Sequence, residues 1–264
     1  MQFEGKNVVI TGGTGGIGLA LARCFLMNGA EKMALLDRDN RNDLVTILRK
    51  TFPTKTIISH STNVCDQNDV ERTFNNVIST FQTIDCVVAC AGVLNEDDYR
   101  LTVEVNLMGV IHTNYTAMKY MSKEAGYNGG LIVNIASVCG IDCSQFSTPS
   151  YNATKHGVVA FTRSLGDTYF YEKTGIKFVA MCPGVTITEF LDNLERRMIS
   201  IEAYELTSKK LESVLKQSVD EFVTAFIDVL KQDKNGSVWL IDGGKFKEIT
   251  YPNPWYDNRI QNQA

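Results

Sequence analysis

Tyr151 and Lys155 are the two side chains whose types and spacing point most directly to chemistry. They stand four residues apart in the stretch Tyr-Asn-Ala-Thr-Lys, and residues at i and i+4 share one face of an α-helix. An ammonium group near a phenol favours the phenolate, so we expect the pKa of Tyr151 to lie below its usual value of about 10. A pKa lowered by about two or three would let Tyr151 exchange a proton at neutral pH. The same spacing also arises by chance on any surface helix.

Ser137 and Asn106 are the polar side chains that would complete such a site. Ser137 follows the apolar run 131–136 and precedes Tyr151 by 14 positions. Asn106 lies inside the long amphipathic stretch 99–124. Asparagine is poorly suited to a helix interior because its side chain competes for backbone hydrogen bonds, and such a local misfit often marks a site. An exposed asparagine within a helix is also common, so both interpretations of Asn106 stay open.

A glycine-dense turn near the N-terminus has the form of an anion-binding loop. The apolar run 7–11 leads into Gly12, Gly16 and Gly18, and a helical pattern begins at Leu19. A Cβ at these glycines would keep the backbone away from a pyrophosphate, whereas the N–H groups of the following helix would bind its charge. The turn therefore predicts dinucleotide binding, although glycine-rich turns also serve close packing.

Asp37 favours one kind of dinucleotide. It ends the second apolar run, 32–37, and follows Gly18 by 19 residues. A carboxylate at this place accepts hydrogen bonds from the adenosine ribose and repels a 2′-phosphate, so NAD is predicted rather than NADP. Arg38 follows directly and offers a phosphate a partner, so an NADP-dependent carbonyl reductase remains an alternative. The simpler interpretation makes Asp37 a turn residue.

Two further loops lie where a cofactor would meet the same edge of a sheet. Asn63 and Val64 follow the third apolar run and are predicted to meet the edge and face of an adenine, whereas Asp66 is expected to cap the helix that starts near Gln67. The fourth run breaks at Ala91-Gly92, where small residues leave room for a cofactor or for tight packing.

The elements that must position these residues alternate in a regular way. Apolar, β-branched runs of strand length are separated by longer amphipathic stretches, which is typical of a parallel sheet covered by helices on both faces. We therefore predict an α/β fold with a doubly wound, seven-stranded parallel sheet of the Rossmann type. With five prolines and no linker-like stretch, residues 1–264 are expected to form a single domain. The predicted strands are 7–11, 32–37, 55–60, 85–90, 131–136, 176–181 and 236–240.

The composition of the chain argues against several classes of protein and of binding site. A net charge of −4 disfavours binding to nucleic acid or to an acidic membrane. The seven cysteines are an odd number without a Cys-x-x-Cys pair, which indicates a reducing compartment. The three histidines stand at no ligand spacing from a cysteine, so no metal site is predicted. Since no signal peptide or membrane span is visible, we expect a cytoplasmic protein.

Taken together, these motifs resemble those of the short-chain dehydrogenase/reductase family. The resemblance covers nearly the whole chain. Within the family, residues 121–124 and 129–134 are similar to the branch that contains 15-hydroxyprostaglandin dehydrogenase, whereas residues 235–239 and the tail through Trp255 are similar to insect-type alcohol dehydrogenases. The motifs that carry the resemblance are Thr11–Gly18, Ala91-Gly92, Asn106, Ser137, Tyr151–Lys155 and Cys182-Pro183-Gly184.

The resemblance implies a role for each residue of the site. Tyr151 would be the acid and base, Lys155 would lower its pKa and bind the nicotinamide ribose, Ser137 would bond the substrate oxygen, and Asn106 would anchor a water that relays protons toward Lys155. Hydride would pass between an alcohol and NAD. The implied cofactor-binding residues are Gly12, Thr14, Gly16, Ile17, Gly18, Asp37, Asn63, Val64, Ala91, Gly92, Tyr151, Lys155, Pro183, Gly184 and Thr188.

Three departures from the family pattern support a rival interpretation. Ala89-Cys90 replaces the asparagine pair of the usual Asn-Asn-Ala-Gly turn, Asn63 replaces an aspartate, and the interval from Ser137 to Tyr151 is one residue longer than usual. None removes a catalytic group. They are nevertheless compatible with a non-catalytic protein of the same fold that binds a nucleotide or ligand in storage or regulation.

The substrate and the partners are predicted from the remaining stretches. Residues 188–217 carry an apolar face that either covers a hydrophobic alcohol as a lid or packs against the body. The loop with Cys143, Ser144, Phe146 and Thr148 adds few charges, so an apolar secondary alcohol or ketone of lipid, terpenoid or steroid type is expected.

The resemblance implies a homodimer or homotetramer through helices near 99–124 and 150–174. Residues 251–264 would form an arm on a partner subunit or fray.

Overall fold

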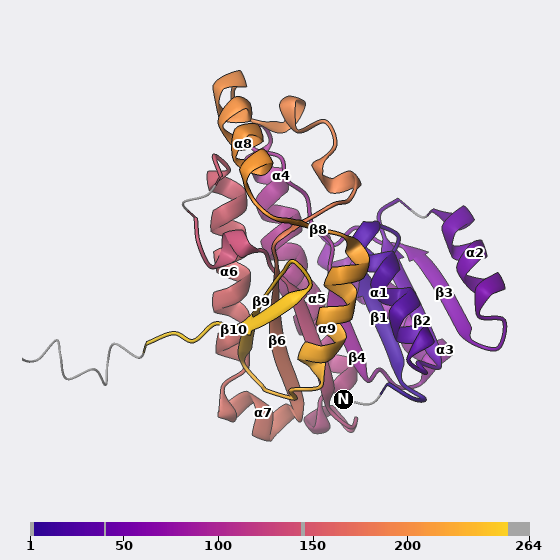
Figure 1. Cartoon of the computed structure of the whole chain (residues 1–264). Helices are drawn as coiled ribbons and strands as arrows, with labels where there is room; N and C mark the ends of the chain where they lie inside the picture. Colours follow the sequence, from indigo (N-terminus) through magenta and orange to yellow (C-terminus); the bar gives the residue numbers. More distant parts are fainter. Residues whose placement is uncertain (1–2, 40, 144–145, 253–264) are drawn as a thin grey trace, which may run out of the picture.

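The computed structural model describes residues 3–39, 41–143 and 146–252 (Figure 1). The main sheet is built from β1 Asn7–Thr11, β2 Lys32–Asp37, β3 Thr56–Ser61, β4 Cys86–Ala89, β5 Gly130–Ile135, β6 Ile176–Pro183, β9 Ser237–Asp242 and β10 Lys245–Glu248. The α-helices are α1 Gly16–Met27, α2 Asn42–Thr51, α3 Gln67–Phe81, α4 Tyr99–Val103, α5 Gly109–Met121, α6 Pro149–Leu165, α7 Thr168–Thr174, α8 Ile201–Ser213 and α9 Val219–Leu230. Shorter elements are the π-helical turn η1 Glu104–Met108, the 3₁₀ turns η2 Lys123–Ala125, η3 Val138–Gly140, η4 Glu189–Leu191 and η5 Leu194–Arg197, and the strand pair β7 Val185–Thr186 and β8 Lys216–Gln217.

The sheet has the order β10-β9-β6-β5-β4-β1-β2-β3. All seven predicted strands are present, and their mutual pairings are parallel. The chain reverses direction across the sheet between β3 and β4, so the carboxyl ends of β1 and β4 are neighbours at a topological switch point. Ligands of doubly wound folds bind at such a point.

The prediction of seven strands was wrong by one, because β10 adds an eighth strand to the sheet formed by the described residues. It pairs antiparallel with β9. Gly243 and Gly244 connect the two strands with φ values of +56° and +69°, the backbone of a two-residue hairpin. The Asp-Gly-Gly-Lys stretch is the sequence signal that would have revealed this hairpin.

Helices cover both faces of the sheet. α1, α2 and α9 pack on one face through an apolar cluster that includes Leu21, Phe25, Val45 and Phe226. Residues of α3 and α5, including Phe74 and Ala117, pack with inward-facing strand residues in a second cluster. α6 contributes to a third, through Val158 and Val159. The doubly wound prediction is therefore confirmed. No helix within the described residues is long and apolar enough to cross a membrane.

Two predicted long helices are interrupted. The stretch 99–124 contains α4, the π-helical turn η1 and α5 instead of one uniform helix, and Asn106 lies in the π turn. The stretch 150–174 contains α6 and α7, because Gly166 ends the first and the Asp167 side chain caps the second. Insertions of π geometry are frequent at functional sites, so the misfit of Asn106 in the sequence has a structural counterpart.

A buried amide network ties the sheet to α5 and α6. Asn114 donates to Asn134 Oδ1 at 2.7 Å, and Asn134 Nδ2 donates to Asn114 Oδ1 at 3.1 Å and to Thr162 Oγ1 at 2.9 Å. Asn134 on β5 stands in register with Ala89 on β4. The central strand has Ala89 where the family usually has an asparagine, and the adjacent strand β5 supplies one buried amide, Asn134, in register with this position.

Candidate active site

A cavity of about 970 Å³ opens at the carboxyl edge of the sheet. It brings the glycine turn, Asp37, Asn63 and Val64 together with Ser137, Tyr151 and Lys155, and with Pro183, Gly184 and Thr188 after β6. The volume lies at the upper end for ligand sites in proteins. Within the part of the chain that the structure describes, all predicted site residues except Thr14 and Asn106 line this cavity.

The glycine turn forms a cradle that has no room for side chains. A Cβ at Gly12 would lie 2.8 Å from the Cα of Ala91, and one at Gly16 would lie 2.8 Å from Cγ2 of Thr188. Gly12 also has a φ of +66°, which favours glycine. The cradle is followed by the N-terminus of α1, whose first N–H groups have no helical partner. These features fit the pyrophosphate of a dinucleotide.

Thr14 holds the cradle from behind instead of facing the cavity. Its N–H donates to Asp37 Oδ2 at 3.0 Å, and its hydroxyl donates to the carbonyl of Asp39 at 3.1 Å. Asp37 therefore joins the glycine turn to the end of β2 and also lines the cavity. The guanidinium of Arg38 lies 3.3 Å from the carboxylate of Asp39. This carboxylate partly neutralises the positive charge of Arg38.

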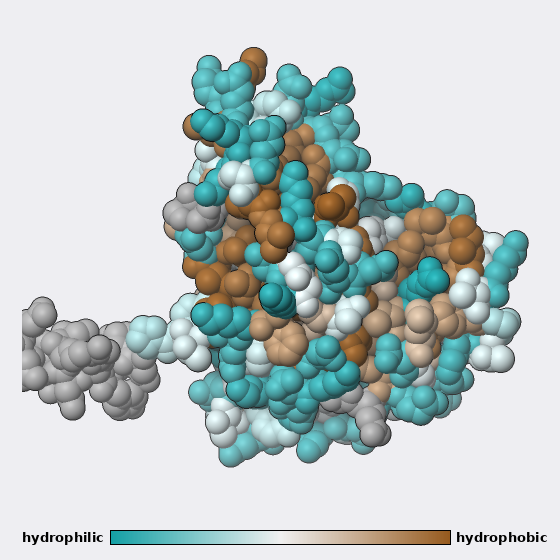
Figure 2. All heavy atoms as spheres, in the orientation of Figure 1, coloured by the Kyte–Doolittle hydropathy of each residue, from teal (hydrophilic) through white to brown (hydrophobic). Residues whose placement is uncertain are grey.

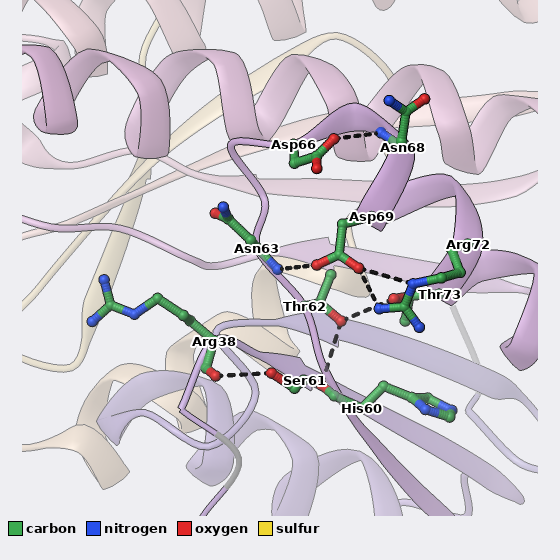
Figure 3. A network of polar contacts seen from close by, with 10 residues as sticks. All are labelled: Arg38, His60, Ser61, Thr62, Asn63, Asp66, Asn68, Asp69, Arg72 and Thr73. Carbon is green, nitrogen blue, oxygen red and sulfur yellow. Dashed lines mark hydrogen bonds and ion pairs between the residues drawn. The ribbon is translucent and has the colours of Figure 1, made fainter.

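Asn63 lines the cavity and lies in a polar network with Asp69 and Arg72 (Figure 3). Its N–H donates to Asp69 Oδ2 at 2.8 Å, and Asp69 also pairs with Arg72. The side-chain oxygen of Asn63 accepts from the N–H of Cys65 at 3.1 Å, which uses one of its two lone pairs. Asp66 caps α3 by accepting from the N–H of Asn68, as predicted.

Tyr151 and Lys155 lie together on the buried face of α6. Only 8% of Tyr151 and 4% of Lys155 is exposed. The ammonium nitrogen of Lys155 is 5.5 Å from the centroid of the Tyr151 ring and donates to the carbonyl of Ile135 at 3.1 Å. α6 begins with Pro149, whose fixed φ suits a first helical turn. The spacing predicted from the sequence thus places both groups in one buried pocket.

The predicted direction of the Tyr151 pKa was wrong for the chain alone. Burial raises the pKa of Tyr151 because the phenolate loses its solvation, and a hydrogen bond with Ser137 opposes this effect only in part. Burial also lowers the pKa of Lys155 to about 8. The sequence argument considered the mutual attraction of the two charges, whereas desolvation is the dominant effect at this depth.

Ser137 and Asn106 approach the pair from two other elements. Ser137 ends β5 and accepts from the N–H of Cys139 at 3.2 Å, at the start of η3. Asn106 is fully buried and holds the turn after β4 by exchanging hydrogen bonds of 2.7 and 2.8 Å with the backbone of Val93. A Cβ at Gly92 would lie 3.4 Å from Asn106 Oδ1 and 3.5 Å from Lys155 Nζ.

Cys90 replaces the family's second turn asparagine, and its surroundings keep it neutral. Its N–H donates to both the carbonyl and the hydroxyl of Thr11, each at 3.2 Å, so the turn is held in place. Burial raises the pKa of the Cys90 thiol to about 12. The thiol of Cys182 has a pKa raised to about 12 for the same reason. These thiols pack beside Lys155 and are poor nucleophiles at neutral pH.

The stretch 188–217 lies over one end of the cavity. Its cavity-lining side chains include Phe190, Leu191, Leu194 and Leu211, and the Phe190 ring centroid is 6.0 Å from that of Tyr151. Other apolar residues of the same stretch face outward, and hydrophobic atoms gather on the surface around α6 and α8 in Figure 2. Cys143, Phe146 and Thr148 precede α6 as expected, whereas Ser144 lies outside the described residues.

Sequence reasoning missed Glu96 and Arg197, which connect this stretch to α6. Glu96 belongs to an acidic run, Glu96-Asp97-Asp98, that resembles a solvated turn. In the structure only 2% of Glu96 is exposed. No sequence signal distinguishes it from its two acidic neighbours.

Comparisons with known proteins agree with this geometry. The model of the short chain dehydrogenase family matches residues 6–198. Alcohol dehydrogenase 1 of Ceratitis capitata is 31% identical over 260 residues, which are 97% of this chain and 100% of the relative. The 15-hydroxyprostaglandin dehydrogenase (NAD(+)) of Rattus norvegicus is 31% identical over 253 residues, 93% and 94% of the two chains. The crystal structure of levodione reductase matches with a TM-score of 0.78, 27% identity and coverage of 92% and 98%.

The chain therefore belongs to the short-chain dehydrogenase/reductase family of oxidoreductases, whose members bind nicotinamide cofactors and act on small alcohols or ketones. Within the family it is similar to insect alcohol dehydrogenase and to 15-hydroxyprostaglandin dehydrogenase, as the sequence motifs predicted.

Proposed function

We propose that this protein is an NAD-dependent alcohol dehydrogenase that oxidises apolar secondary alcohols, or reduces the corresponding ketones. The observation that carries the proposal is the buried cluster of Ser137, Tyr151 and Lys155 in the same cavity as the glycine cradle. A cavity that joins a cofactor cradle to a buried acid and base suits hydride and proton transfer at one carbon.

Each residue of the cluster has a distinct task in this proposal. NAD, when bound, accepts a hydride from the carbinol carbon. Tyr151 takes the hydroxyl proton, Ser137 holds the substrate oxygen, and Lys155 binds the ribose and supplies a positive charge beside the phenol. Asn106 fixes the Val93 turn, and its predicted role in proton relay remains part of the proposal. The remaining cofactor contacts are those predicted from the sequence, except that Thr14 acts from behind the cradle through Asp37.

NAD is proposed over NADP because of the charges near Asp37. Its carboxylate lines the cavity at the end of β2, where a 2′-phosphate would be repelled. Arg38 is partly neutralised by Asp39. Binding studies with both cofactors test this choice, and tighter binding of NADP would favour the alternative of an NADP-dependent carbonyl reductase.

An apolar substrate is proposed because the end of the cavity beside Tyr151 is lined by apolar side chains. Leu94, Phe146, Phe190 and Leu194 surround the catalytic end, and an apolar wall selects substrates by the area they bury. We expect kcat/KM to increase as the alkyl groups on the carbinol carbon lengthen.

The test is turnover of a panel of secondary alcohols with NAD, followed by the absorbance of the reduced nicotinamide. Tyr151→Phe removes only the hydroxyl, so we expect it to lower kcat about 100- to 10,000-fold while NAD binding stays unchanged. Equal rates for wild type and variant across a broad panel would refute the proposal. Binding of NAD without turnover of any alcohol or ketone would instead support the non-catalytic storage or regulatory alternative.

A further inference from the structure

Glu96 is a buried carboxylate bound to the first turn of the helix that carries Tyr151. Its Oε1 accepts from the N–H of Tyr151 at 2.7 Å, and its Oε2 accepts from the N–H of Ser150 at 3.0 Å. The first four N–H groups of a helix have no partner within it, and a negative charge near them is favourable. Thr148, the residue that precedes α6, makes no side-chain cap, because its hydroxyl donates to Asn152 instead.

The backbone that carries Glu96 is itself fixed. The N–H of Asn95 donates to the hydroxyl of Thr102 at 3.2 Å, and this hydroxyl donates to the carbonyl of Asn95 at 2.6 Å. Thr102 belongs to α4 and is fully buried. Glu96 therefore connects α4 to the start of α6. Its two partners, Ser150 and Tyr151, follow it by 54 and 55 residues in the sequence.

The same segment is attached to the cover of the cavity through Arg197. The N–H of Glu96 donates to the carbonyl of Arg197 at 2.7 Å. The Arg197 guanidinium donates to the carbonyl of Leu94 at 3.2 Å and to that of Phe190 at 2.9 Å. Phe190 packs beside Tyr151, so the segment 94–96 is linked through Arg197 to a residue that covers the site and directly to the helix that supplies the phenol.

We propose that Glu96 is a positioning residue for Tyr151: its two hydrogen bonds to the start of α6 hold the phenol hydroxyl toward Ser137 and the substrate oxygen. This inference rests on the proposed dehydrogenase function. The two hydrogen bonds of the Glu96 carboxylate are to the backbone of Ser150 and Tyr151 and not to the phenol, so the proposal gives Glu96 no part in proton transfer. A displacement of about 1 Å at a reacting group costs about 100-fold in rate, which sets the scale of its effect.

Glu96→Gln is the variant that tests the proposal, because it keeps the length of the side chain but places an NH₂ group against a backbone N–H. We expect kcat to fall about 10- to 100-fold, with KM and the NAD dissociation constant changed by less than about threefold, because the binding surfaces are untouched. The matched control is Glu221→Gln. Glu221 accepts from the N–H of Ser218 in the capping box of α9, outside the cavity, so its loss lowers stability but leaves kcat unchanged.

A second measurement reports on Tyr151 without turnover. In protein labelled with ¹³C in the tyrosine rings, the spectrum of Tyr151→Phe assigns the Tyr151 signal. We expect this signal to move in Glu96→Gln and to stay in place in Glu221→Gln. If Glu96→Gln does not fold, Glu96→Asp, which keeps the charge but cannot reach both N–H groups, is expected to show the same changes.

Two outcomes would overturn the inference: an unmoved Tyr151 signal, or a kcat within about twofold of wild type. Wild-type protein that turns over no alcohol would refute the proposed function, and the Tyr151 signal would still decide whether Glu96 positions this side chain. The two failures are therefore distinguishable.

Discussion

At the scale of single residues, the site places a cation where water is scarce. Lys155 lies close to the turn after β4. One of its three N–H groups donates a hydrogen bond to the carbonyl of Ile135. The pKa of Lys155 falls from 10.5 to about 8 because burial penalises the ammonium form. At about 1.4 kcal/mol for each pKa unit, this burial costs on the order of 3 kcal/mol of folding stability at neutral pH.

We therefore expect Lys155→Met to be more stable than wild type at pH 7, by about 1 to 2 kcal/mol once the lost hydrogen bond to Ile135 is included. Between pH 8 and 10.5 the unfolded lysine binds more protons than the folded one, so the destabilisation that Lys155 causes decreases as pH rises. The advantage of the variant should shrink over this range. Urea unfolding of wild type and variant at pH 7 and pH 10 measures both effects, and a stability difference between the two proteins that is the same at both pH values would contradict the burial argument. Turnover should be lost.

The charge of Asp37 leads to a second prediction, which concerns the preference for NAD over NADP. Asp37→Ser removes the carboxylate that is proposed to bind the adenosine ribose, so we expect the ratio of kcat/KM for NAD to that for NADP to fall by at least about tenfold, or about 1.4 kcal/mol. Asp66→Asn is the control, because it removes a helix-capping carboxylate. An unchanged ratio in Asp37→Ser would show that another residue selects the cofactor. NAD binding itself should also weaken, since Thr14 loses a hydrogen-bond acceptor.

At the scale of elements, the amides of Asn114 and Asn134 decide how well β5 is joined to α5. Asn134→Ala leaves the buried Oδ1 of Asn114 without the donor Asn134 Nδ2, which costs about 1 to 3 kcal/mol, whereas Asn114 Nδ2 still donates to the carbonyl of Val110. We expect a lower free energy of unfolding by this amount. Ala89→Asn in the same background places an amide on the neighbouring strand, in register with position 134, and is expected to recover part of the loss. No recovery would mean that the two positions are not equivalent.

Most of the parallel strands could be predicted because strands buried on both faces form continuous apolar runs, whereas β3 is partly exposed and carries polar residues. The site followed from them, since Ser137, Ala91 and Asp37 stand at or just beyond the ends of such runs. β10 could not be found by the same rule, because residues such as Lys245 and Phe246 at the sheet edge are exposed and form no apolar run.

Other features depend on tertiary contacts that a local pattern does not contain. The π turn around Asn106 keeps the same amphipathic pattern as an α-helix, so only the misfit of Asn106 indicated it. The burial of Glu96 depends on backbone groups of α6 more than 50 residues away. The pKa of Tyr151 depends on the depth of the cavity, which spacing along a helix cannot give.

At the scale of the whole molecule, the side chains proposed for catalysis lie between two layers that are packed differently. The helices and strands beneath them form close-packed clusters of fully buried residues such as Phe74 and Phe178. The cover above them, from η4 to β8, is joined to the body by fewer apolar residues and by the hydrogen bonds of Arg197 with Leu94 and of Thr207 with Ser147. Substrate access is therefore expected to depend on this cover, because regions with few buried contacts open most readily.

The face formed by α5 and α6 predicts how copies of the chain associate. Tyr115 on α5 is 49% exposed, and its ring lies edge-on to that of Phe161 on α6, with centroids 5.7 Å apart. Aromatic residues at the centre of an interface contribute much of its binding energy, so we propose that this face forms a homodimer, with a homotetramer as the alternative. Tyr115→Glu is expected to yield monomers in sedimentation velocity at micromolar concentration, because a carboxylate would be buried without a partner.

Ile47→Glu, at an exposed apolar position on α2, is the control and should leave the assembly intact. A wild-type monomer, or a Tyr115→Glu variant that sediments like wild type, would contradict this assignment.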